Sequence, residues 1–461
     1  MAVDRSGPSA DFTHGDLRVS RNRRYLLHSD GTPFFWLADT AWELFHRLNR
    51  EEVELYLENR RRKGFTVVQA VVLAELDGIR TPNAYGHVPL VDDDPTKPNE
   101  AYFQHVDYVM KVAQEKGMVV GMLPTWGDKV GSLRRSWGTG PAGLINANNA
   151  RAYGRFLGER YRGFPNLVWI LGGDRSPEGF IHVWRELAEG LAEGDGGRHL
   201  KTYHPWGETS SSYWLHHERW LDFNLLQSGH GSKVPNNYRM IAYDYNLAPA
   251  KPCLDGEPAY EDHPIGWNPD NGWFNDFDVR QRAYYALFSG AHGHTYGCHD
   301  IWQMWQPGRE PISNARTPWR DALDLPGSFD MLHVRDLMES RPFLVRVPDQ
   351  SVVYGDCGAG SDYIAATRAS DGSYAFVYIP DGRAVTVNMS LISGSRAVGY
   401  WYDPREGTAS LIGVFPTAGT RVFEPPSKGY GCDWVLVLDD ESRGFPPPGS
   451  SRDAMGKEAP G

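Results

Sequence analysis

The chain has 461 residues, of which 41% are hydrophobic and 13% aromatic, so it can bury a large core and is not a disordered protein. A net charge of -11 argues against a nucleic-acid partner, and we interpret the basic cluster from Arg60 to Arg62 as a helix face. No apolar stretch approaches about eighteen residues and no apolar signal region begins the chain. We therefore expect no membrane contact and a cytoplasmic location, or secretion if a signal has been removed.

From residue 33 to about residue 340, short apolar runs alternate with amphipathic segments, which is the pattern of repeated βα units. In segment 49–64, Asn49 and Glu52 predict a capping box and Gly64 predicts the helix end. Strands are predicted over 33–40, 65–73, 118–124, 166–171, 200–205, 223–230, 251–258 and 293–302. Helices are predicted over 49–64, 101–117, 148–163, 179–194, 236–246, 278–290 and 329–342.

This succession predicts an α/β fold, a (β/α)8 TIM barrel. An open doubly wound sheet is the alternative, which the count of strands and the lack of a G-x-G-x-x-G motif after the first strand disfavour. Beyond Pro342 the apolar runs become short and turn-separated, which predicts a small C-terminal antiparallel β-sandwich domain. The predicted domains are a catalytic barrel over 17–342, an accessory β-sandwich over 343–441 and a disordered, Pro/Gly/Ser-rich tail over 442–461.

Cysteine and histidine patterns bear on metal binding. The cysteines are Cys253, Cys298, Cys357 and Cys432. They lie far apart without a C-x-x-C motif, so we predict free thiols. The histidines His292, His294 and His299 raise the alternative of a metal-dependent hydrolase, which a chelator would inactivate. Because no H-E-x-x-H pattern accompanies them, we predict no metal and no cofactor.

A TIM barrel carries its active site at the carboxyl ends of its strands, so the residues where the apolar runs stop are candidate site residues. Two of these are acids, Asp174 after the fourth predicted strand and Glu257 after the seventh, which should face each other across the barrel mouth. Glycosidases use such a pair, separated by about 5 to 5.5 Å for retention and about 6.5 to 9.5 Å for inversion. Alternatively, each acid caps a helix or forms an ion pair, and Arg175 could lower the pKa of Asp174.

The other strand-end residues are predicted to bind substrate, because polar groups can bind sugar hydroxyls and aromatic rings can stack on sugar C–H faces. They are Asp39, Trp126, His204, Gln227, His230 and Trp302. Further tryptophans in or near the loops after the strands are candidates for the same cleft. They are Trp206, Trp267, Trp273 and Trp305.

Several motifs together resemble a known family. "FFWLADTAWELFHRL", "GGDR", "TYHPWG", "LLQSGHG" and "DGEPAYE" are similar to the apiosidase-like family of glycoside hydrolases, the glycoside hydrolase family 140 type, over Leu17 to Pro342. The "WYDPREG" motif resembles the collagen-binding-like β-sandwich that accompanies it. The resemblance implies a retaining mechanism with Asp174 as acid/base and Glu257 as nucleophile. The wider clan has Asn-Glu where this chain has Gly173-Asp174, and the shorter acid suggests a furanoside substrate.

The sequence therefore predicts a retaining glycoside hydrolase with a carbohydrate substrate, cleaving a plant or microbial glycan, with an apioside or other furanoside as one candidate linkage; the sugar itself is not predicted. The alternative is a carbohydrate- or matrix-binding protein whose barrel is inactive. Acids at both catalytic positions argue against that alternative.

Overall fold

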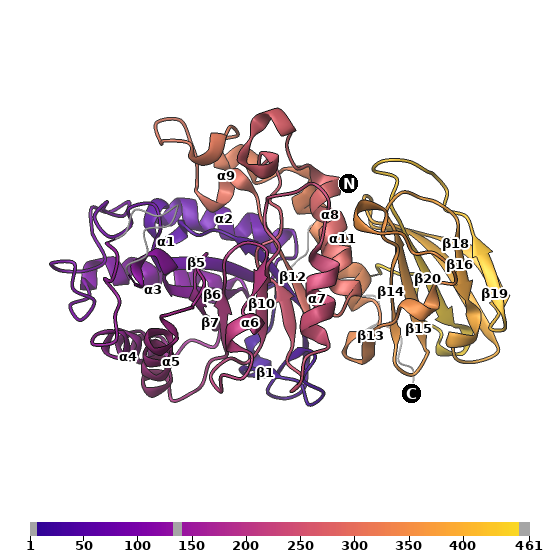
Figure 1. Cartoon of the computed structure of the whole chain (residues 1–461), viewed down its shortest axis with the longest axis horizontal. Helices are drawn as coiled ribbons and strands as arrows, with labels where there is room; N and C mark the ends of the chain where they lie inside the picture. Colours follow the sequence, from indigo (N-terminus) through magenta and orange to yellow (C-terminus); the bar gives the residue numbers. More distant parts are fainter. Residues whose placement is uncertain (1–6, 132–140, 451–461) are drawn as a thin grey trace.

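The structure of the protein is a computed structural model that describes residues 7–131 and 141–450. Two parts lie side by side along the long axis of the molecule (Figure 1). The first is a mixed α/β part that ends with α11 (Pro326–Glu339), and the second is an antiparallel part that begins with β13 (Arg346–Pro348). Residues 451–461 of the predicted disordered tail lie outside the described residues.

Parallel strands form the centre of the first part. They are β4 (Trp36–Thr40), β5 (Val67–Leu73), β6 (Val119–Thr125), β7 (Leu167–Gly172), β8 (Lys201–His204), β10 (Asn224–Gln227), β11 (Cys253–Asp255) and β12 (Gly293–Tyr296). Six of them form a curled sheet in the order β12-β4-β5-β6-β7-β8. In this sheet β4, the first of the eight strands in sequence, pairs with β12, the last.

The parallel pair β10 and β11 fills the remaining gap in this curled sheet. On one side the Asp222 amide donates to the Lys201 carbonyl at 2.8 Å, and on the other the His292 amide donates to the Cys253 carbonyl at 3.0 Å. The strands thus follow each other in sequence order around a TIM-like barrel. A doubly wound sheet, whose strand order reverses at the first strand, is excluded.

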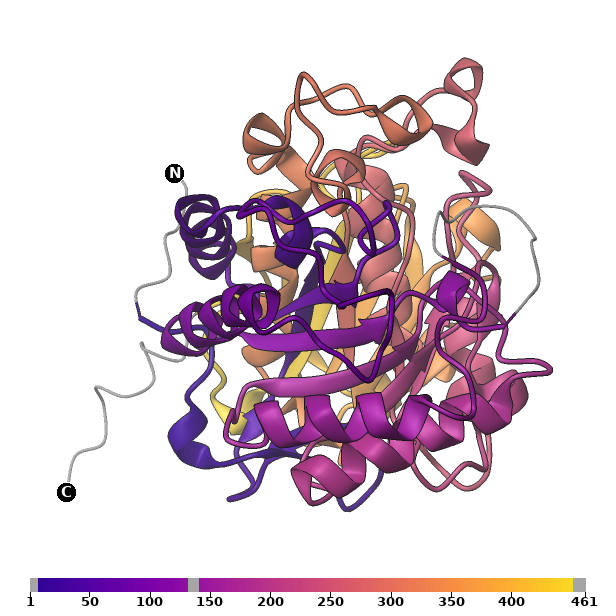
Figure 2. The same ribbon diagram turned by 90° about the vertical axis from the view of Figure 1, so that its left-hand side faces the viewer.

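Helices cover the outside of the curled sheet (Figure 2). The longer ones are α2 (Arg50–Arg62), α3 (Glu100–Glu115), α4 (Ala150–Tyr161), α5 (Ile181–Asp195), α7 (Asn237–Tyr245), α8 (Asp276–Phe288) and α11. The capping box predicted at the start of α2 is confirmed, because the Asn49 side chain accepts from the Glu52 amide and Glu52 accepts from the Asn49 amide. Between β8 and β10 the chain forms only the short β9 (Thr209–Ser210) and α6 (Ser212–Leu215).

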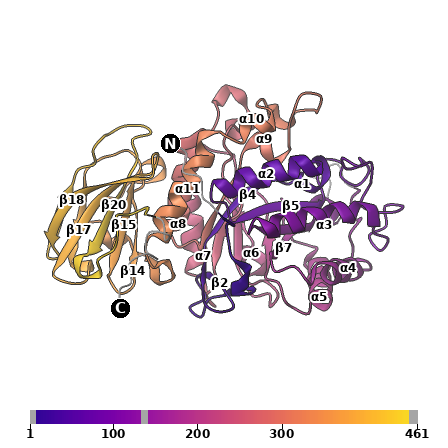
Figure 3. The same cartoon turned by 180° about the vertical axis from the view of Figure 1, so that it is seen from behind.

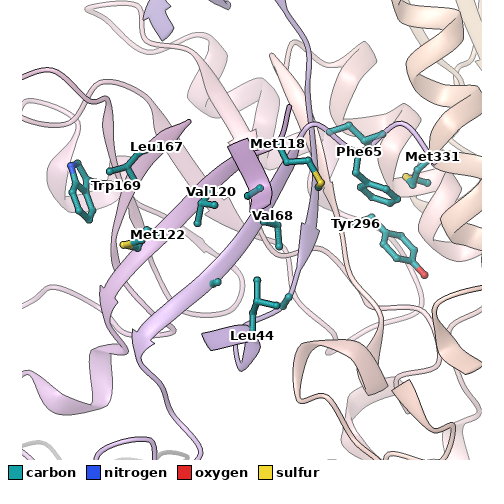
Figure 4. Packing of buried hydrophobic residues seen from close by; sticks show 14 of the residues in the cluster. Leu44, Phe65, Val68, Met118, Val120, Met122, Leu167, Trp169, Tyr296 and Met331 are labelled. Carbon is teal, nitrogen blue, oxygen red and sulfur yellow. The ribbon is translucent and has the colours of Figure 1, made fainter. Parts of the chain in front are cut away.

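Alternation of side chains along each strand divides the barrel into an inner and an outer core. Val67, Val119 and Val168 point inward and pack with Leu225 and Leu254 from the opposite strands. Their chain neighbours point outward and pack beneath the helices (Figure 4). Those labelled in the figure include Val68, Val120 and Trp169.

Several observed strands are shorter than predicted, such as β10 and β11, and two predicted segments also take a different course. Segment 33–40 is divided, because β3 (Pro33–Phe34) pairs with β2 (Leu26–His28) in an N-terminal hairpin that also holds β1 (Leu17–Val19). Segment 293–302 leaves the sheet after β12, and α9 (His299–Trp302) turns across the barrel mouth. The Asp300 carboxylate accepts from the Arg316 and Thr317 amides, which ties this turn to the following loop.

The C-terminal part is an antiparallel sheet domain. Its six-stranded sheet has the order β13-β14-β15-β20-β17-β18, and a two-stranded sheet pairs β16 with β19. The strands after β13 are β14 (Ala365–Ala369), β15 (Tyr374–Ile379), β16 (Val385–Asn388), β17 (Arg396–Asp403), β18 (Thr408–Pro416), β19 (Thr420–Phe423) and β20 (Trp434–Asp440). Side chains of both sheets share one hydrophobic core, in which Val385 and Phe423 pack with Val377 and Leu436.

The sheet domain packs on α8 and α11 (Figure 3). The Tyr284 ring of α8 stacks on Tyr378 of β15 at 4.7 Å between centroids, with 8° between the planes. The Arg280 guanidinium of α8 forms two hydrogen bonds with the Asp433 carboxylate, at 2.9 and 2.8 Å. All residues of α8 from Phe277 to Phe288 are buried, because the barrel covers one face and the sheet domain the other.

Two further observations concern the described residues. The cysteines are all free, as predicted. In ranges 7–131 and 141–450, no helix is both long and apolar enough to span a membrane.

Candidate active site

A cavity of about 530 Å³ opens where the barrel strands end. Its walls come from the loops after most of the parallel strands, and they combine acids, histidines and aromatic rings. The acids are Glu75, Asp174, Glu208 and Glu257; the other polar and aromatic residues are Trp42, Trp126, Trp206, Gln227, His230, Tyr260, His263, Trp267, His299, Trp302 and Ser313.

The end of β7 brings Asp174 into this cavity through a sharp turn. Gly172 (φ 90°), Gly173 (φ 114°) and Asp174 (φ 51°) all have left-handed backbone conformations. A Cβ on Gly173 would lie 2.7 Å from the Trp126 ring and 2.9 Å from the Gly127 nitrogen, so only glycine fits there. This close backbone approach leaves the Asp174 side chain 26% exposed.

Asp174 has an unusually high pKa for an aspartic acid. Burial and the neighbouring charge of Glu257 raise its pKa to about 7, although Arg175, His204 and a hydrogen bond from Gln227 act in the opposite direction. Arg175 does lower this pKa, as the sequence suggested, because its Nη1 lies 3.3 Å from the carboxylate. Burial has the larger effect, so the pKa is raised overall. A carboxyl with this pKa can carry a proton near neutral pH.

Glu257 follows β11 and has the opposite character. Burial alone opposes its ionisation, but contacts with two histidines lower its pKa to about 2. His204 Nε2 lies 2.8 Å from Oε2, and His230 Nε2 lies 3.2 Å from Oε1. With its side chain only 8% exposed, Glu257 is a buried carboxylate with a histidine nitrogen close to each oxygen.

His204 connects the two acids. The Asp174 amide donates to His204 Nδ1 at 3.2 Å, so this nitrogen is the acceptor and the ring proton lies on Nε2. Nε2 faces Glu257, where the N–H stabilises the carboxylate. The backbone of the acid/base candidate therefore fixes the tautomer that supports the nucleophile candidate.

The structure brings together five of the six predicted substrate-binding residues. Trp126, Gln227, His230 and Trp302 line the cavity, and His204 lies beneath it in contact with Glu257.

Asp39 does not line the cavity, so we do not propose it as a substrate-binding residue. Its Oδ2 accepts hydrogen bonds from the Tyr56 hydroxyl at 2.7 Å and from Arg60 Nε at 2.6 Å, both in α2. Strand alternation explains this, because Trp36 and Ala38 belong to the inner core and Asp39 therefore points to the helices. Arg60 of the basic cluster is buried in this contact.

Glu75 is a cavity residue that sequence reasoning missed. It follows β5 and is 3% exposed. Burial first, and then repulsion by Glu43 and Asp174, raises its pKa well above the ordinary value of a glutamic acid. The rule that identified Asp174 and Glu257, an acid where a buried strand stops, applies equally to Glu75.

The histidines of the metal hypothesis take separate places. His292 packs edge-on against Trp36 and Phe223 in the barrel core, whereas His299 Nε2 contacts the Ile312 and Ser313 carbonyls beside the cavity. Within the described ranges, no group of three or more His, Cys, Asp or Glu side chains is arranged to hold a metal ion.

A TIM-like barrel with a pair of carboxyls at its mouth, whose pKa values are shifted in opposite directions, is typical of a glycoside hydrolase. Comparison with known proteins identifies the family. Residues 20–345 match the family model "Apiosidase-like, catalytic domain", so the chain belongs to the apiosidase-like family. Residues 347–439 match the model "Putative collagen-binding domain of a collagenase".

Solved structures of similar proteins are also glycoside hydrolases. A protein titled "Glycoside hydrolase" is 36% identical, with a TM-score of 0.86 over 94% of this chain and 98% of its own. A glycoside hydrolase family 5 structure from Bacteroides vulgatus ATCC 8482 is 35% identical, with a TM-score of 0.88 and 95% of each chain covered. No curated protein matches the chain.

Proposed function

We propose that the protein is a retaining glycoside hydrolase in which Asp174 is the acid/base and Glu257 the nucleophile. The observation that carries this proposal is the opposite character of the two carboxyls, which favours a protonated Asp174 and an ionised Glu257 in one cavity. The name of the matching family supports an apioside or other furanoside of a plant or microbial glycan as substrate.

In the first step, Asp174 donates its proton to the glycosidic oxygen while a Glu257 oxygen attacks the anomeric carbon. The bond from that carbon to the leaving oxygen breaks, and a glycosyl ester of Glu257 forms. In the second step, Asp174 takes a proton from water as the water oxygen attacks the anomeric carbon, which regenerates the Glu257 carboxylate and the acid form of Asp174. His204 and His230 position and stabilise that carboxylate in both steps.

The test is hydrolysis of synthetic aryl glycosides, furanosides included. Glu257→Ala should lose several orders of magnitude of rate on every substrate, because the attacking group is gone. Asp174→Ala should lose most on poor leaving groups, and azide should restore turnover with retained anomeric configuration. Glu115→Ala, an exposed acid outside the cavity, is the matched control and should keep full activity.

Two outcomes would contradict the proposal. An inverted product would show that Glu257 activates water instead of attacking the sugar. A folded wild-type protein that hydrolyses no glycoside but binds glycans would favour the alternative of an inactive, carbohydrate-binding barrel.

A further inference from the structure

Two large aromatic side chains stand exposed at the mouth of the catalytic cavity. Trp206 is 45% exposed and Trp267 is 56% exposed, and both line the cavity that holds Asp174 and Glu257. Trp206 lies in the loop after β8, and Trp267 lies in the loop after β11. Exposed indole surface is costly in water, so its concentration on one cavity rim indicates a surface that a ligand covers.

The loop that carries Trp206 also brings a carboxylate to this rim. Glu208 is exposed, lines the same cavity, and makes no side-chain hydrogen bond or ion pair within ranges 7–131 and 141–450. Its backbone is nevertheless fixed, since its amide donates to the Gln227 carbonyl at 2.8 Å in a left-handed conformation with φ 59°. The backbone of Glu208 is therefore fixed, while its carboxylate oxygens can accept hydrogen bonds from a ligand.

Gly231 keeps open the space between Glu208 and Trp267. A Cβ at Gly231 would lie 3.1 Å from Glu208 Oε1 and 4.0 Å from the Trp267 ring, so both side chains border this bare stretch of backbone. The Gly266 amide donates to the His230 carbonyl at 2.9 Å, which fixes the loop that carries Trp267. The gap is thus part of a defined structure.

The His230 ring lies between this rim and the candidate nucleophile Glu257. His230 contacts Glu257 Oε1 at 3.2 Å, and its ring meets the Trp267 ring edge-to-face, with 6.1 Å between centroids. Trp267 therefore lies one side chain away from the candidate nucleophile. A molecule on the rim would be next to the group that is cleaved.

We propose that Trp206, Glu208 and Trp267 form a second sugar-binding subsite, which holds the glycan ring adjacent to the one being cleaved. The indole rings would stack on the C–H faces of that ring, and the Glu208 carboxylate would accept hydrogen bonds from its hydroxyl groups. The natural substrate is then at least a disaccharide. This inference rests on the proposed glycosidase function and adds the size of the substrate to it.

The test compares a substrate that reaches the rim with one that does not. The first is an apiose-terminated oligosaccharide from plant cell wall, and the second is apiosyl fluoride, which has a single sugar ring and a one-atom leaving group. Trp206→Ala, Trp267→Ala and Glu208→Gln should each lower kcat/KM on the oligosaccharide about tenfold, the equivalent of about 1.4 kcal/mol. On apiosyl fluoride, which does not reach the rim, each variant should lose clearly less than on the oligosaccharide.

Tyr354→Ala is the matched control, because Tyr354 is 68% exposed and lies in the sheet domain outside the cavity. Trp267→Phe, which keeps an aromatic ring, should recover part of the loss and guards against misfolding of Trp267→Ala. Equal losses on both substrates, or no loss on the oligosaccharide, would overturn the subsite.

If wild-type protein cleaves neither compound, an apioside is not its substrate, the glycosidase proposal is tested separately on the aryl glycosides, and the subsite is judged by calorimetry. In that case, tighter binding of the oligosaccharide than of free apiose, weakened by Trp206→Ala and Trp267→Ala, would still support the subsite. Equal binding of the two sugars would refute it.

Discussion

Asp174 and Glu257 share one cavity, yet their pKa values move in opposite directions, to about 7 and about 2. Burial raises both values, so the difference comes from the neighbours. Glu257 faces two histidine nitrogens, whereas Asp174 faces the charge that Glu257 carries. One well-stabilised carboxylate thus keeps the proton on the other, which is the division of roles that a retaining glycosidase needs.

The pH profile of kcat/KM should reflect these two groups. Activity requires protonated Asp174 and ionised Glu257, so it should decline as pH rises through about 7 and again as pH falls through about 2. Initial rates at low substrate concentration measure the profile. A rate that rises between pH 6 and 8 would show that Asp174 does not act as the acid.

Burial and nearby carboxylates raise the pKa of Glu75 well above the usual value, which favours its protonated form. Glu75→Gln, which resembles the protonated acid in shape, should retain activity and leave the alkaline limb of the pH profile in place. If Glu75 were ionised, removing its charge would lower the pKa of Asp174 and move that limb to lower pH. The measurement is the midpoint of the limb in both proteins.

Among the structural elements, the turn after β7 constrains the site most. A methyl group at Gly173 would collide with the Trp126 ring and the Gly127 backbone, and φ 114° is unfavourable for any L-residue. Gly173→Ala should therefore displace Asp174 and lower kcat/KM about 100-fold, the cost of roughly 1 Å of misplacement. Gly163→Ala is the control, because its added methyl meets open space. Wild-type kinetics for Gly173→Ala would refute the argument.

Hydrophobic periodicity predicted the barrel well because the strands are buried runs and the helices carry caps, as at Asn49 and Glu52. It could also have placed Asp39, since alternation with Ala38 turns that acid toward the helices. Other features had no local signal. The contact of His204 with both acids joins β7, β8 and β11, and such a contact depends on how the barrel closes.

At the scale of the whole molecule, a buried ion pair joins the barrel to the sheet domain. Arg280 of α8 binds Asp433 of the sheet domain and Asp330 of α11, and its side chain is 1% exposed. Together with the stacked Tyr284 and Tyr378 rings, this contact makes the face of α8 a shared core. The sheet domain therefore completes the burial of a barrel helix, and we expect the two parts to unfold together.

Arg280→Met should test this coupling. The substitution keeps most of the apolar stem but leaves the Asp433 carboxylate buried without its cation, so it should reduce the free energy of unfolding by about 3 to 5 kcal/mol. Urea denaturation followed by tryptophan fluorescence and by circular dichroism measures the loss. Arg396→Met is the matched control, because its 3.2 Å pair with Glu441 is exposed and is worth about 0 to 1 kcal/mol. Equal losses for the two variants would refute a structural role for the buried contact. Two separate unfolding transitions in the wild-type protein would show instead that the sheet domain and the barrel are stable independently, in spite of the core that they share.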